Sequence, residues 1–69
     1  MKTFHLNRIK DVSGISGTGI VANGVEFNDG KCVISWFGPI HSIEIFNSIH
    51  EIDAIHGHKG ATLLVYDKE

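Results

Sequence analysis

The chain has 69 residues, of which 42 % are hydrophobic, and it carries a formal net charge of −2 and a single cysteine. A chain this short forms one domain, residues 1–69, with a small core, and the lone Cys32 excludes both an internal disulfide and a multi-cysteine zinc site. The slightly acidic balance argues against general nucleic-acid binding, which requires a basic face.

Two strands are predicted in the first part of the chain. The first covers residues 3–9, where apolar and polar residues alternate with one irregular step. The second covers residues 20–27, and Val21 and Val25 belong to its apolar face. Gly24 interrupts this strand, which indicates a bulge or a close approach of the backbone to another group.

A hairpin follows at FNDGK, residues 27–31, and it is the strongest local signal in the sequence. Asn-Asp-Gly between two strand-like segments supplies the positive φ values that a tight hairpin needs. The next strand, at 31–38, carries bulky side chains on both faces, which predicts an interior position in the sheet. Gly38 and Pro39 end it, because proline cannot donate to a strand ladder. A fourth strand is predicted at 42–46.

A short helix is predicted after the fourth strand. Ser48 and Glu51 have the spacing of a capping box, and Gly57 stands where the helix ends. Two helical turns are not stable alone, so the apolar stripe of this helix must lie on the sheet. The stripe consists of Ile49, Ile52 and Ile55. A last strand at 61–66 completes an α+β domain of order β-β-β-β-α-β, with a curved, mainly antiparallel sheet.

Self-association is an effective way for so small a domain to bury more apolar surface, so the chain is predicted to form a homodimer or a larger homo-oligomer. The N-terminal sequence lacks the uninterrupted apolar stretch of a signal peptide. No segment approaches the roughly 20 apolar residues of a membrane span. We therefore expect a cytoplasmic protein without membrane attachment.

The glycine-rich stretch SGISGTG, residues 13–19, is the first candidate site. Its backbone N–H groups and hydroxyls can wrap an anion, with Arg8 or Lys10 nearby for charge. It is neither a P-loop, which needs a lysine after its last glycine, nor a dinucleotide fingerprint. A turn between two strands is the alternative. The residues predicted to line a ligand loop are Ser13, Gly14, Ser16, Gly17, Thr18 and Gly19.

Histidines and aromatic residues supply the second group of candidates. His56 and His58 can donate hydrogen bonds to a ligand or bind a metal, but no thiol or carboxylate has a spacing that completes a metal site, so neither a metal nor a cofactor is predicted. Exposed or helix-capping histidines are the alternative. Trp36 and Phe37 point to opposite faces of one strand, and one of them can stack on a base, with core or dimer packing as the alternative.

Catalysis is not expected from this sequence. Cys32 lies in an apolar strand, where an inert, buried thiol is the expectation. The acidic residues show no pairing that indicates a general acid and a general base. The chain is therefore interpreted as a non-enzymatic binding protein.

The segments SGISGTGIVANGVEFNDG and SIHEIDAIHGHKGAT, with SW between them, resemble a group of small bacterial and phage or prophage proteins. The resemblance covers most of residues 11–62 and brings no catalytic residues with it. It implies a phage accessory protein, a class that includes small oligomers that sequester nucleotide immune signals.

Two functions follow from the resemblance and the candidate residues together. The first is binding of a phosphorylated, nucleotide-like small molecule at a subunit interface. The loop amides and Arg8 or Lys10 would hold phosphate, Trp36 or Phe37 would stack on a base, and His56 or His58 would donate hydrogen bonds. The alternative is a protein-interaction module or structural accessory protein that acts on a host protein and has no small ligand.

Overall fold

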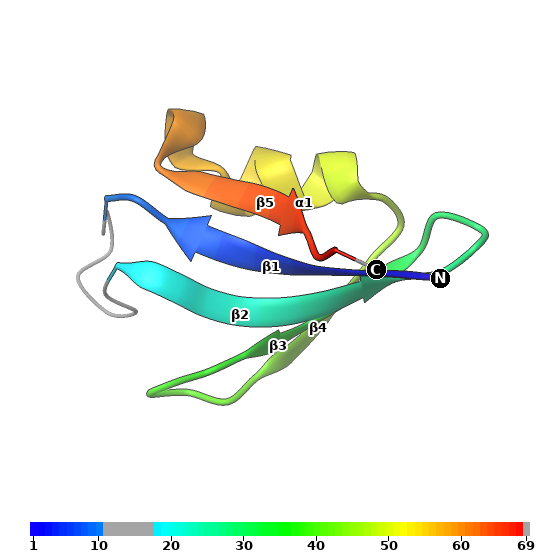
Figure 1. The fold of residues 1–69 in the computed structure, drawn as a ribbon, viewed down its shortest axis with the longest axis horizontal. Helices are drawn as coiled ribbons and strands as arrows, with labels where there is room; N and C mark the ends of the chain where they lie inside the picture. Colours follow the sequence, from blue (N-terminus) through cyan, green and yellow to red (C-terminus); the bar gives the residue numbers. More distant parts are fainter. Residues whose placement is uncertain (11–17, 69) are drawn as a thin grey trace.

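The computed structural model of this chain describes residues 1–10 and 18–68, with the backbone alone at His58. Within these residues, five strands form one antiparallel sheet of order β4-β3-β2-β1-β5, and a helix lies on one side of it (Figure 1). The elements are β1 (Lys2–Arg8), β2 (Gly19–Glu26), β3 (Cys32–Trp36), β4 (Ile43–Phe46), α1 (Ile49–His56), the 3₁₀ turn η1 (His58–Gly60) and β5 (Thr62–Tyr66). The predicted α+β fold and its element order are confirmed.

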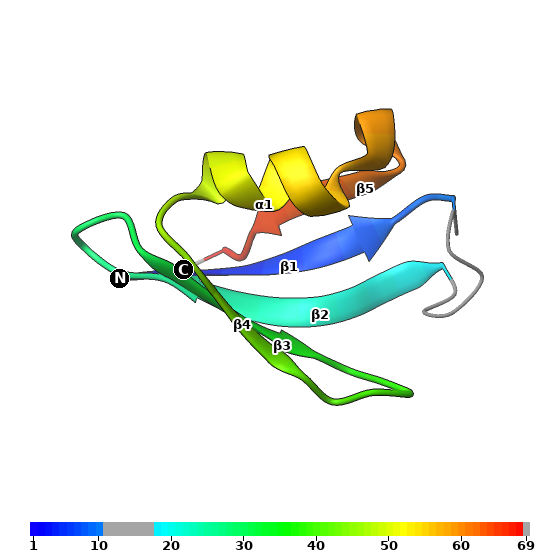
Figure 2. The same cartoon turned by 180° about the vertical axis from the view of Figure 1, so that it is seen from behind.

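The core lies between α1 and the sheet face beneath it. The helix contacts both β4 and β5, although these strands form opposite edges of the sheet (Figure 2). One short helix can reach both edges only if the sheet is strongly curved, with its concave face toward the helix. The buried apolar residues are Phe4, Leu6, Val21, Ala22, Cys32, Ile34, Phe46 and Ile52.

The concave face explains the small residues of β2. Gly24 pairs with Phe4 on one side and with Ile34 on the other, and both of these neighbours are fully buried. Directly paired residues share a face, so Gly24 faces the core and Val25 faces away from it. The sequence prediction, which put Val21 and Val25 on one apolar face, therefore holds at Val21, which is buried in the core, and was wrong at Val25, because the Phe4 ring fills the space above Gly24.

The hairpin predicted at residues 27–31 is confirmed. The Phe27 N–H donates to the Lys31 carbonyl over 2.8 Å, and the Gly30 N–H donates to the Phe27 carbonyl over 2.9 Å. Gly30 has φ +94°, a conformation that residues with a side chain rarely adopt. The Asp29 carboxylate accepts a hydrogen bond from the Lys31 backbone N–H over 3.1 Å and thereby closes the turn.

This turn gives a prediction about acid stability. The hydrogen bond from the Lys31 backbone holds the pKa of the Asp29 carboxyl below its ordinary value of 3.8. A carboxyl with a lowered pKa in the folded state stabilises the fold above its unfolded pKa, and this contribution is lost as the pH falls through the folded value. Asp29→Asn keeps the acceptor oxygen without titrating, so its stability is expected to fall less than that of the wild type between about pH 4 and about pH 2.

Urea denaturation at several pH values measures this difference. Asp29→Ala serves as the comparison because it removes both the charge and the acceptor, so it should also be less stable near neutral pH. Identical acid profiles for the wild type and Asp29→Asn would contradict the assignment.

The helix differs in detail from its predicted form. Its N-terminal residue follows Ser48, but the Ser48 side chain makes no capping hydrogen bond. Glu51 accepts instead from the backbone N–H of Asn47 over 2.7 Å, so the predicted capping box was wrong. Gly57 does follow the helix, as predicted, and its backbone remains right-handed.

The apolar stripe of the helix also needs correction. Ile49 and Ile52 pack toward the core, whereas Ile55 is 58 % exposed. At 3.6 residues per turn, Ile55 lies about 120° around the helix from Ile49, while His56 lies only about 20° from it. A histidine, rather than a third isoleucine, therefore completes the sheet-facing side of α1.

Candidate functional site

Three sequence features that are far apart in the chain meet at one end of the sheet, which we call the loop end (Figure 1, left). The strand β1 finishes here at Arg8, which pairs with Gly19 at the start of β2 and with Thr62 at the start of β5. Trp36 ends β3, and His56 ends α1. The described end of the glycine-rich stretch, the SWFGP segment and the IHGH segment therefore lie at the loop end.

Arg8 occupies the core-facing side of β1 and is only 4 % exposed. Its Nε donates a hydrogen bond of 3.0 Å to the Thr62 hydroxyl on the neighbouring strand. Its Cζ lies 5.8 Å from the centre of the Trp36 ring, within the range of a cation–π contact. The guanidinium is thus held by a hydroxyl and an aromatic ring, and both partners reach it across the sheet.

Glu44 joins the aromatic residues of this cluster. Its Oε1 accepts a hydrogen bond of 2.6 Å from Trp36 Nε1, and His56 Nε2 lies 2.9 Å from the same oxygen. The His56 nitrogen is not aligned for a hydrogen bond and has no hydrogen-bond partner among the described residues, although it is buried. The Trp36 and His56 rings meet edge to face, 4.9 Å apart. The Glu44 carboxylate thus fixes the position of the Trp36 ring, which in turn contacts Arg8.

Positive charge gathers at the loop end of a chain that is acidic overall. Three of its six lysine and arginine residues, Arg8, Lys10 and Lys59, lie there. The Lys10 N–H donates to the Ala61 carbonyl over 3.3 Å, which ties the end of β1 to the segment that carries Lys59. Asp53 lies beside Gly57 and joins Glu44 at this end, whereas the other described acidic side chains lie elsewhere, namely Glu26, Asp29, Glu51 and Asp67. Among the described residues of the loop end, the cationic side chains thus outnumber the carboxylates.

Comparison with known proteins identifies the family. The family model of the Acb5 phage protein matches residues 1–68 of the chain. The chain belongs to the Acb5 phage protein family. No curated protein and no solved structure matched. The resemblance to small phage proteins is thus confirmed in its broad form.

The predicted site residues of this Acb5-family protein divide into two groups. Arg8, Trp36 and His56 come together, as the ligand hypothesis requires. Thr18 and Gly19 are exposed at the start of β2, and Gly19 has φ +88°. The other predicted positions lie outside the described residues or, for His58, have no described side chain. These positions are Ser13, Gly14, Ser16, Gly17 and His58.

Sequence reasoning missed Glu44 and Thr62 as members of the cluster. Glu44 alternates with two isoleucines in a strand, and this pattern alone does not tell whether the glutamate or the isoleucines face the core. Thr62 is a single hydroxyl at the start of the last strand. Thr62 reaches Arg8 only because β5 pairs with β1, and the sequence carries no local signal for this pairing.

Other chemistry finds little support in the described part of the chain. No group of three or more His, Cys, Asp or Glu side chains in residues 1–10 and 18–68 is placed to hold a metal ion. Cys32 is fully buried, and burial raises the pKa of its thiol, so the reactive thiolate is disfavoured. Among the described helices, none is long and apolar enough to cross a membrane.

Proposed function

We propose that this phage protein is a small accessory protein that binds a phosphorylated, nucleotide-like molecule at the loop end and catalyses no reaction on it. The observation that supports this function best is the placement of Arg8. Its guanidinium is held between Thr62 and Trp36 at the end of β1, directly beside Gly19 on β2.

The chemistry of phosphate recognition fits these residues. An arginine fork can give two parallel hydrogen bonds to phosphate oxygens, and a site that fixes the fork in advance reduces the entropy lost on binding. Lys10 and Lys59 add positive charge that attracts an anion from solution. Lys59 adopts a left-handed conformation, φ 57°, which is costly for a residue with a side chain and recurs at binding sites.

Trp36 has a positioning role in this proposal. Its ring is half-buried, its Nε1 is bound to Glu44, and its face is turned to Arg8. These contacts support a ring that orients the guanidinium. They give less support to the sequence-based hypothesis that Trp36 stacks on a base.

Native mass spectrometry and calorimetry test the proposed function with the full chain. The probe is a mixture of nucleoside mono-, di- and triphosphates together with the parent nucleosides. We expect a bound phosphorylated compound, no bound nucleoside, and an affinity that falls as salt is raised, because exposed charges are screened.

A pair of variants locates the site. Lys10→Gln combined with Lys59→Gln should weaken binding about tenfold or more at low salt, because two cations near the anion are lost. Lys31→Gln removes a lysine from the opposite end of the sheet and should leave the affinity unchanged. A protein that binds none of the phosphorylated compounds, or a double variant that binds as well as the wild type, would overturn the proposal.

A further inference from the structure

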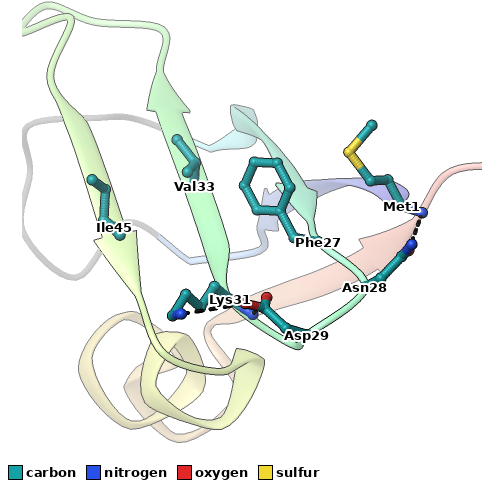
Figure 3. A pocket seen from close by; sticks show the side chains of 7 residues that line it. All are labelled: Met1, Phe27, Asn28, Asp29, Lys31, Val33 and Ile45. Atoms are coloured by element: carbon teal, nitrogen blue, oxygen red, sulfur yellow. Dashed lines mark hydrogen bonds and ion pairs between the residues drawn. The ribbon is translucent and has the colours of Figure 1, made fainter.

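The sheet face that points away from α1 carries a group of apolar side chains that are exposed or, at Val33, half-buried. We call it the outer patch, and it consists of Met1, Phe27, Val33, Ile43 and Ile45. Ile45 and Val33 are directly paired on β4 and β3 and stand beside Phe27 at the rim of an open hollow of about 630 Å³ (Figure 3).

In β4 the apolar side chains point to solvent and the glutamate points to the core side, which is the reverse of the pattern expected for an isolated domain. Ile43 and Ile45 are 68 % and 76 % exposed, whereas the glutamate between them faces the core side and binds Trp36. A strand with one face in water normally places its polar residues there. The two most exposed positions of β4 therefore carry side chains suited to a buried surface.

The extent of the outer patch approaches that of an interface. From the exposed fractions of Met1, Phe27, Ile43 and Ile45, we place its area on the order of 500 Å², in the upper part of the range for the largest apolar patch of a small protein, a patch that is often functional. A standard interface buries about 800 Å² on each partner, so the patch supplies more than half of that area and its polar rim supplies the rest.

We propose that the outer patch joins two copies of this chain face to face in a two-fold symmetric dimer. A symmetric interface must be complementary to itself. The rim contributes to this condition because Asp29 and Lys31 lie side by side with their charged atoms 3.3 Å apart, so the charges of these two residues balance on each copy. Face-to-face contact is required because pairing along the free edge of β4 would leave Ile43 and Ile45 in water.

This dimer is independent of the proposed ligand. The outer patch extends toward Met1 and Phe27, at the end of the sheet opposite Arg8, and it lies on the opposite face from the Arg8 side chain. If the protein binds no nucleotide, the dimer proposal is unaffected. If the protein does not dimerise, the charged residues of the loop end are still in place to bind a ligand.

Sedimentation velocity over about a hundredfold range of protein concentration tests the interface. The wild type should sediment as a dimer at the higher concentrations. Ile45→Glu should weaken dimerisation at least about tenfold, because it places a charge at the centre of an apolar contact. Ile55→Glu is the matched control, since Ile55 is a comparably exposed isoleucine on α1 outside the patch, and it should dimerise as the wild type does.

Circular dichroism establishes that both variants are folded. A wild type that stays monomeric at every concentration overturns the proposal. The proposal is also overturned if such a monomer binds a host protein through the same patch. Equal dimerisation of Ile45→Glu and the wild type also overturns it.

Discussion

Gly24→Ala is expected to lower the free energy of unfolding by about 3 kcal/mol, the upper part of the range for overpacking a core. A Cβ atom at position 24 would overlap the ring of Phe4, which is fully buried on the paired strand. The ring has little freedom to move, because it is closed in by the core and meets Tyr66 edge to face at 6.3 Å. Chemical denaturation followed by circular dichroism measures the loss.

A double variant shows whether the Phe4 ring is the cause. Phe4→Leu shortens the side chain and should by itself cost about 1 kcal/mol. Combined with Gly24→Ala, the total loss should be smaller than the sum of the two single losses, because the smaller side chain gives the new methyl group room. Strictly additive losses, or a Gly24→Ala protein as stable as the wild type, would mean that the close packing of ring on glycine does not constrain the fold.

The same pair of residues illustrates what the sequence could and could not predict about the fold. The hairpin at Asn28 and Gly30 was predictable because its determinants are local turn residues. The irregular glycine in β2 was also recognised, with a close backbone approach as one of two interpretations. Which face of β2 the helix covers was not predictable, because alternation separates two faces without assigning them. Only the pairing with Phe4 identifies the side bearing alanine and glycine as the core side.

The candidate site shows a similar division. Arg8, Trp36 and His56 were each selected for their chemistry, and the structure brings them to one end of the sheet. Their meeting depends on strand order, which places β1 and β3 on either side of β2. Glu44 and Thr62 are common residue types at unremarkable spacings, so their part in the cluster follows from tertiary contacts alone.

Arg8→Lys is the most direct variant for separating binding from stability at the loop end, and we expect it to weaken binding of the phosphorylated ligand at least about tenfold. Lysine keeps the positive charge but loses the planar fork and its stacking on the Trp36 ring. The hydrogen bond from Nε to Thr62 is also lost, so the free energy of unfolding should fall by about 1 kcal/mol.

The control for this experiment must lose similar stability without changing Arg8 or the two residues that hold it. Ile52→Val is suitable because Ile52 lies in the core beneath α1, and such a truncation typically costs about 1 kcal/mol. Calorimetric titration of both variants then distinguishes the two roles of Arg8. If Arg8 binds phosphate, affinity falls in Arg8→Lys and is unchanged in Ile52→Val. If both variants retain full affinity, the guanidinium serves only to join β1, β3 and β5, and the ligand contacts must come from other residues of the loop end.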